Sequence, residues 1–169
     1  MILCCTATGN SLYVAKQLDD KRISIPQALK MNDLVFHEDS IGIVCPIYGH
    51  EMSKMVKQLL QKATFHTDYF YIILTYGALH GGAAELAQNY LESVGKKANY
   101  IANIMMVDNF LPNFDMIEQC ALDKKIPEKI DKIKNDIYHH VHHIEKAGLK
   151  NKLTSLLYTR MHCFSEIRT

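Results

Sequence analysis

The chain is divided into short blocks of apolar residues, which predict strands, and longer amphipathic blocks, which predict helices. Continuous apolar runs predict buried parallel strands over residues 2–5, 40–45 and 69–76. Weaker patterns predict an early strand over residues 21–28 and a last one over residues 99–107. Apolar positions three or four apart predict helices over residues 12–18, 52–62, 83–94 and 127–147. This alternation indicates an α/β fold, with an open doubly wound parallel sheet and helices on both faces.

Proline and glycine mark several of the expected boundaries. Pro26 predicts an edge strand or the end of a strand, and Pro46 is expected to end the run that begins at Ser40. The residues after Pro46 are expected to form a loop, and the pattern over 29–39 leaves an irregular segment and a short helix both open. Gly95 and Gly148 are expected to end helices. We therefore expect a single domain over residues 1–169, in which residues 149–169 form a helical extension.

Composition and charge exclude several classes of protein. The chain has 169 residues, of which 48% are hydrophobic, and no apolar run is long enough to predict a membrane span. The formal net charge of +1 gives no general attraction to nucleic acid. The five cysteines form no CxxC motif, so we read those in strands as buried thiols in a reducing compartment. With no basic, apolar leader before the first strand, we expect a cytoplasmic location.

The turn after the first predicted strand is rich in hydrogen-bonding side chains. It joins that strand to a helix and carries three hydroxyl groups and one amide, in the order Thr6, Ala7, Thr8, Gly9, Asn10 and Ser11. The free N–H groups and the dipole of a helix N-terminus favour a phosphate there. No GxxxxGK[ST] or GxGxxG motif is present, so neither a Walker loop nor a dinucleotide-binding turn is predicted. The alternative is an ordinary turn in which Asn10 or Ser11 caps the helix.

This turn resembles the phosphate loop of flavodoxins, which holds the phosphate of FMN. Two later segments resemble the loops of that family that contact the flavin ring, namely Pro46, Ile47, Tyr48 and Gly49, and Thr75, Tyr76 and Gly77. Met106 to Pro112 is similar to a segment of bacterial flavodoxin–ferredoxin fusion proteins, with Val107 where a proline is usual. The resemblance covers residues 1 to about 115 and implies a flavodoxin-like strand order of 2-1-3-4-5. It also implies that these thirteen residues bind FMN.

Several side chains have two interpretations. Tyr48 is expected either to stack on the flavin or to be a half-buried surface residue, and Tyr76 either to stack or simply to end its strand. His80 is interpreted as a solvated loop residue or as a donor to a reduced flavin. His139 and His143 would lie four residues apart on a helix, a spacing that suits a metal, but no further ligand is fixed beside them. We therefore predict no metal site.

Three functions follow from the resemblance. The first is an FMN-binding protein that transfers electrons to a redox partner protein or small acceptor. That partner could be a separate ferredoxin, because the clustered cysteines of the fused ferredoxin are missing here. The second is an FMN-dependent NAD(P)H oxidoreductase acting on a quinone or another small acceptor. The third is a binding module that lacks the cofactor.

The predicted flavin loops contain no carboxylate, so we expect little repulsion of an anionic reduced flavin.

Overall fold

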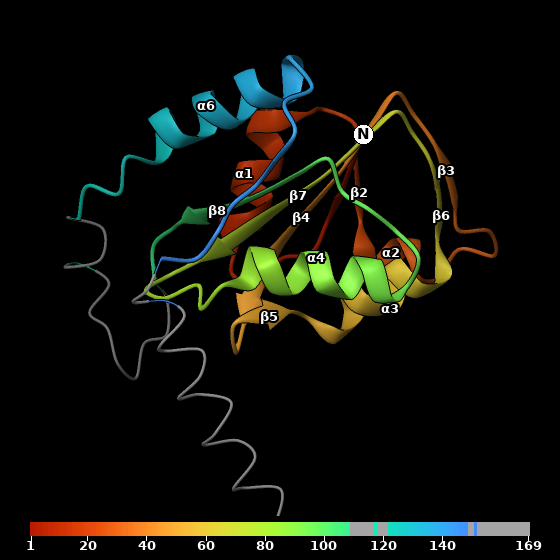
Figure 1. Cartoon of the computed structure of the whole chain (residues 1–169), viewed down its shortest axis with the longest axis horizontal. Coiled ribbons are helices and arrows are strands. Elements are labelled where there is room, and N and C mark those ends of the chain that lie inside the picture. The colour runs from red at the N-terminus through yellow and green to blue at the C-terminus, as the bar shows by residue number, and fades with distance from the viewer. Residues whose placement is uncertain (109–116, 118–121, 149–150, 152–169) are drawn as a thin grey trace, which may run out of the picture.

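A mostly parallel β-sheet lies between two layers of helices (Figure 1). The computed structural model describes residues 1–108, 117, 122–148 and 151. In spatial order, the parallel strands are β2 (Arg22–Ser24), β1 (Ile2–Cys4), β4 (Ser40–Tyr48), β7 (Tyr69–Tyr76), β8 (Tyr100–Met105) and β9 (His143–Ile144). Numbered along the chain within this sheet, the first five have the order 2-1-3-4-5, which is that of the flavodoxin-like fold. The predicted fold class is confirmed.

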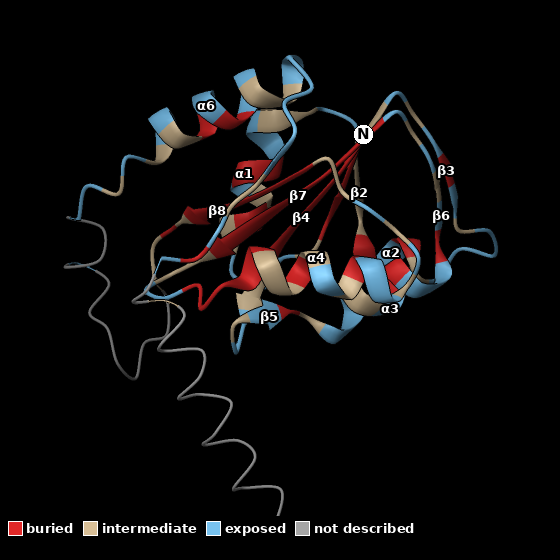
Figure 2. Ribbon diagram, viewed as in Figure 1, coloured by how far each residue is buried: buried red, intermediate tan, exposed pale blue. Residues whose placement is uncertain are grey.

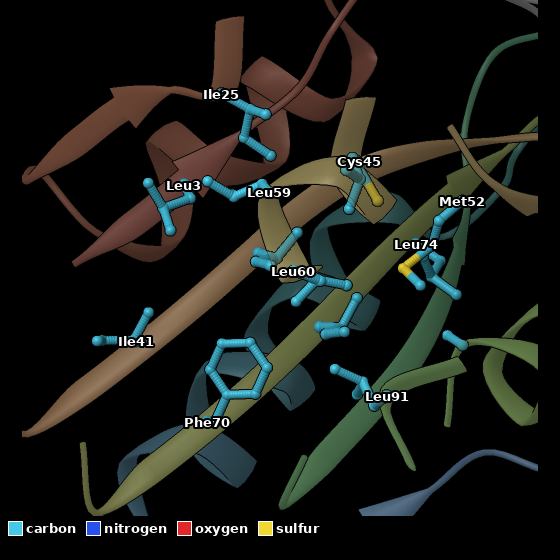
Figure 3. Close-up of a cluster of buried hydrophobic side chains, with 14 of the residues drawn as sticks. Leu3, Ile25, Ile41, Cys45, Met52, Leu59, Leu60, Phe70, Leu74 and Leu91 are labelled. Atoms are coloured by element: carbon cyan, nitrogen blue, oxygen red, sulfur yellow. The ribbon is translucent and has the colours of Figure 1, made fainter. Parts of the chain in front are cut away.

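Each face of the sheet has its own helices and its own apolar core. Figure 1 shows α1 (Asn10–Leu18) and α6 (Ile126–Tyr138) over one face, and α2 (Ile25–Ala28), α3 (Lys54–Lys62) and α4 (Ala83–Ser93) over the other. Side chains of a strand alternate between the faces, so Ile2 and Cys4 pack under α1 while Leu3 packs toward α3. Figure 2 shows the buried residues gathered on the central strands and on the inward sides of the helices. Figure 3 shows the core on the α3 side, with Phe70, Leu59 and Leu91 among its members.

The strand that begins at Ser40 is longer than expected. It continues through Pro46 to Tyr48 and then turns back into β5 (Glu51–Met52), which pairs with it in antiparallel fashion. The prediction of a strand end at Pro46 followed by a loop is therefore wrong. The partner strand β1 already ends at Cys4, so the missing N–H of Pro46 interrupts no pairing on that side.

The connection between β2 and β4 also differs from the prediction. Only the first part of 21–28 is a strand, because Pro26 occupies the first turn of α2, a position where proline suits a helix. Within residues 29–39, where an irregular segment or a short helix was expected, β3 (Val35–His37) pairs in parallel with β6 (Thr64–His66). Phe36 and Phe65 stack in this small sheet, with ring centroids 5.8 Å apart.

The helix predicted over 127–147 is about two turns too long. It ends at Tyr138, and the chain then turns at His140, which has a positive φ of 49°, to form β9. His139 and His143 therefore do not share a helix face, contrary to the premise of the metal interpretation. The His140 ring instead stacks on Tyr69 at 4.6 Å, and the Tyr69 hydroxyl donates to the carbonyl of Val141. No three metal-ligating side chains come together in the described residues.

The other boundaries are close to those predicted. Met52 belongs to β5, and α3 begins after Ser53, whose hydroxyl caps the helix. Gly95, with a φ of 71°, follows the end of α4 as predicted. The helix expected in the extension lies outside the described residues, as does most of the loop after Asp108. Among the described helices, none has the length and apolar character that a membrane span needs.

One prediction concerns the buried Tyr100 hydroxyl, which donates to the Asp136 carboxylate at 3.0 Å. Burial opposes ionisation of Asp136, but hydrogen bonds from Lys132 and Tyr100 outweigh it and lower the pKa of this carboxyl. Tyr100→Phe should therefore reduce the free energy of unfolding at pH 7 by about 1–3 kcal/mol. Because the carboxylate loses its charge in acid, the difference should shrink below about pH 4. Urea titrations at pH 7 and below pH 4 measure the two differences, with Tyr138→Phe as control because Tyr138 is exposed. Equal losses of stability in the two variants at pH 7 would contradict the prediction.

Candidate functional site

A cleft of about 470 Å³ lies at the carboxyl ends of the parallel strands. Its walls come from the turn before α1, the β4–β5 hairpin, the loop after β7 and the end of β8. Apart from Gly9, every residue predicted to bind the flavin lines it, so the structure brings three distant segments of the chain together. The lining residues are Thr6, Ala7, Thr8, Asn10, Ser11, Pro46, Ile47, Tyr48, Gly49, Thr75, Tyr76, Gly77, Ala78, Leu79, Val107 and Asp108. The volume is within the range of small-molecule sites.

The turn before α1 leaves the start of that helix open toward the cleft. Gly9 is the N-cap and has a φ of 100°, a left-handed conformation that glycine adopts without strain. No side chain caps this helix in the described structure, contrary to the alternative in which Asn10 or Ser11 does so. Thr6 accepts a hydrogen bond from the Gly9 N–H at 3.1 Å, and both Thr6 and Thr8 remain exposed. Hydroxyls beside an uncapped helix start can bind an anion.

Asn10 and Ser11 attach this turn to neighbouring strands. The Asn10 amide donates to the carbonyl of Val107 at 2.8 Å. The Ser11 hydroxyl lies 2.8 Å from that of Thr75, and both residues are buried, with exposed fractions of 1% and 2%. A hydroxyl can donate one hydrogen bond and accept others, so this pair leaves Ser11 capacity for a ligand. The two contacts fix the turn relative to β7 and β8.

The β4–β5 hairpin places Tyr48 on the rim of the cleft. Gly49 and His50 form its two-residue turn with φ values of 56° and 68°, as a tight hairpin turn between twisted strands requires. Tyr48 is 53% exposed, so much of its ring is open to solvent. Partial burial nevertheless raises the pKa of its hydroxyl. The residue therefore presents an aromatic side chain that a flat ligand could cover.

The loop after β7 is packed against the hairpin at a point where only glycine fits. A Cβ built on Gly81 would lie 1.9 Å from Nδ1 of His50. The sequence offered no sign of this contact, because Gly81 and Gly82 are also typical of a flexible entry to a helix. The hairpin and the β7–α4 loop thus support each other from outside the cleft.

His80, in the same loop, is buried rather than solvated. It is 8% exposed, and its burial lowers the pKa of the imidazole. The side-chain amide nitrogen of Asn151 lies within hydrogen-bond distance of Nε2, at 2.8 Å. The Tyr76 ring contacts the imidazole edge-on, with centroids 5.1 Å apart. His80 therefore lies behind the cleft wall as a neutral ring that supports Tyr76.

Val107 and Asp108 were not among the predicted site residues. They follow β8 just as the other site loops follow their strands, and this position is the signal that could have identified them. The Asp108 carboxylate lies against Gly77: a Cβ there would be 2.1 Å from Oδ2. The expectation of a site without carboxylates holds for the predicted loops but not for the assembled cleft.

Comparisons with known proteins find only low similarity. No protein-family model matches the chain, and no curated protein matches it. Among solved structures, the two-electron reduced flavodoxin of Megasphaera elsdenii has 15% identity and a TM-score of 0.45, covering 61% of this chain and 85% of its own. The Trp repressor binding protein of Bacillus subtilis has 12% identity and a TM-score of 0.46, covering 80% of this chain and 96% of its own. The rubredoxin oxygen:oxidoreductase of Desulfovibrio gigas has 10% identity and a TM-score of 0.45, covering 79% of this chain and 35% of its own.

A prediction follows from the contact of His50 with Gly81. Gly81→Ala should displace the hairpin and lower the free energy of unfolding by about 2 kcal/mol or more, through backbone strain together with the clash. Gly95→Ala is a matched control, because Gly95 also has a positive φ but no atom lies within 4 Å of its Cβ position. The control should cost about 1 kcal/mol. Equal losses in thermal or urea unfolding would contradict the proposed packing.

Proposed function

We propose that this chain binds FMN in the cleft and transfers electrons through it to a redox partner protein or a small acceptor. The observation that carries the proposal is the convergence of three loops, each following a parallel strand, on one cleft of suitable size. One of these loops provides an uncapped helix start for a phosphate, and the others provide aromatic residues for a flat ring. The site is built almost entirely from neutral groups.

The phosphate would be held by Thr6 and Thr8 together with N–H groups at the start of α1. Thr6 already accepts a hydrogen bond from Gly9, so its own hydroxyl proton remains available to donate. Ser11 would assist while it stays bonded to Thr75. Asn10 would act mainly through its bond to Val107, which holds the turn in place. No Lys or Arg lines the cleft in the described structure, so neutral donors would carry the binding.

The ring would lie between the hairpin and the loop after β7. Tyr48 would cover one side, and Tyr76, whose ring contacts the His80 ring edge-on, would cover the other. Gly49 and Gly77 would let the backbone approach the ligand closely. When bound, FMN supplies the capacity to accept and release one or two electrons. The chain would bind and orient it, and its walls would limit the access of water.

The near-neutral charge gives weight to a second function, an FMN-dependent NAD(P)H oxidoreductase that reduces a quinone or another small acceptor. The chain has 19 basic and 18 acidic residues, so it lacks a general field that would repel an anionic nicotinamide. Rapid NAD(P)H oxidation in the presence of a quinone would favour this function. Slow oxidation of NAD(P)H, with fast electron exchange to a protein such as a separate ferredoxin, would favour the first function.

We propose the cytoplasm as the location for either function, because Cys4, Cys5 and Cys45 are free thiols, as is usual in a reducing compartment.

Thr8 offers a direct test of the phosphate assignment. Loss of a hydrogen bond to a charged oxygen costs about 1.5–3 kcal/mol, so Thr8→Ala should weaken FMN binding about 10- to 100-fold. Riboflavin has no phosphate and should bind both proteins alike. Fluorescence titrations with the two ligands make the comparison, and equal losses for FMN and riboflavin would contradict the assignment.

Tyr48 offers a separate test of the ring position. Tyr48→Ala should weaken FMN and riboflavin by a similar factor, about 5- to 30-fold, and reduce quenching of flavin fluorescence. Tyr13→Ala is a suitable control because Tyr13 is 48% exposed, much like Tyr48, yet does not line the cleft. Quenching that stays unchanged in Tyr48→Ala would place this residue away from the ring.

A further inference from the structure

Two cysteines lie opposite each other on neighbouring parallel strands, directly before the cleft. The pairing of β1 with β4 includes Cys4 and Val44 as partners. The next backbone hydrogen bond runs from the Cys5 N–H to the Val44 carbonyl at 2.9 Å and continues the same register. In a parallel pair, an N–H bonds to the carbonyl one residue before its partner, so this bond places Cys5 opposite Cys45.

The side chains of Cys5 and Cys45 lie on the same face of the sheet. Cys45 is fully buried in the core on the α3 side (Figure 3), and Cys5 packs against that core while remaining partly exposed. Sγ of Cys5 lies 3.9 Å from the hydroxyl of Ser53, the N-cap of α3. Cys4 belongs to the core under α1, because the side chains of a strand alternate between the faces.

This placement meets the distance requirement for a disulfide. Neighbouring strands of a sheet lie about 4.8 Å apart, and the Cα atoms of a disulfide are usually about 4.4–6.8 Å apart. Both cysteines are free thiols in the structure. A bond between them therefore requires no rearrangement of the two strands. Disulfides in a reducing compartment are usually transient, and a pair that is held ready by the sheet suits such a bond.

We propose that Cys5 and Cys45 are a site of reversible oxidation, at which a hydroperoxide such as hydrogen peroxide converts the two thiols into a disulfide. In the first step, the Cys5 sulfur takes one oxygen from hydrogen peroxide, which gives a sulfenic acid and one water molecule. In the second, the Cys45 sulfur bonds to the Cys5 sulfur, and the hydroxyl group leaves with the Cys45 proton as water. Two thiols are oxidised, and one peroxide is reduced to two water molecules.

Burial gives the two thiols different parts in this reaction. Together with the neighbouring thiols of Cys5 and Cys4, it raises the pKa of the Cys45 thiol. Cys45 is therefore protonated at neutral pH and closed to external reagents. Only the partly exposed Cys5 has to meet the oxidant, because the second step takes place between neighbours.

The disulfide would lie at the start of two segments of the cleft wall. Thr6 follows Cys5 and Pro46 follows Cys45, and both Thr6 and Pro46 line the cleft. Oxidation would therefore join the turn before α1 to the β4–β5 hairpin through their supporting strands. The reaction uses no flavin, so this inference does not depend on the proposed binding of FMN.

The test is mass spectrometry of the full chain after treatment with hydrogen peroxide, with free thiols alkylated before the protein is digested with trypsin. Cleavage after Lys16, Lys30 and Lys54 should leave the peptide of residues 1–16 joined to that of residues 31–54, and dithiothreitol should separate them. Cys5→Ser should reduce the yield of the joined peptides by about tenfold or more, because it removes the thiol that reacts first. Cys4→Ser is the matched control, since Cys4 lies in the same peptide but faces α1, and should leave the yield unchanged.

A second variant keeps the test independent of the folding of Cys5→Ser. In Cys45→Ala, the Cys5 sulfenic acid has no partner and should accumulate, where dimedone labels it. No joined peptides in oxidised wild type would overturn the inference. So would their loss in Cys4→Ser with their retention in Cys5→Ser, or a bond of Cys5 mainly to Cys120 or Cys163. Thermal unfolding of each untreated variant confirms that the compared proteins are folded.

Discussion

The cleft depends on the parallel pairing of β4 with β1 on one side and β7 on the other. Cys4 pairs with Val44, and Pro46 pairs with Thr75, so the carboxyl ends of the three strands reach the same edge of the sheet. The loops that follow must then begin side by side. Helices bury the β1–β4–β7 arrangement from both sides (Figure 2).

Contacts between loops turn this common edge into a defined cleft. The Ser11–Thr75 pair and the Asn10–Val107 bond hold the first turn against β7 and β8. Glycine allows two further contacts in which a side chain of one loop lies against the backbone of another. His50 packs on Gly81, and Asp108 packs on Gly77. These contacts hold the walls of the cleft in place.

Much of the fold was predictable, because continuous apolar runs identify buried strands and helical spacing identifies the layers around them. The elements that were missed depend on contacts between residues that are far apart in the chain. Pro46 is tolerated in β4 only because β1 ends early, and β9 has only two residues, held by pairing with β8. The left-handed turn at His140 cuts α6 short of its predicted end. The predicted site loops do meet in one cleft, but the proximity of Asp108 to Gly77 is a tertiary contact that no local pattern reveals.

The proposed function rests on a turn of neutral groups and on two tyrosines that line the same cleft. The most direct measurement is the flavin content of the purified chain, before and after addition of FMN and removal of the unbound excess. We predict a yellow protein that releases one FMN per chain on denaturation, identified by chromatography of the released flavin. A colourless protein that takes up no added FMN would contradict the proposed function and would favour a binding module without a cofactor.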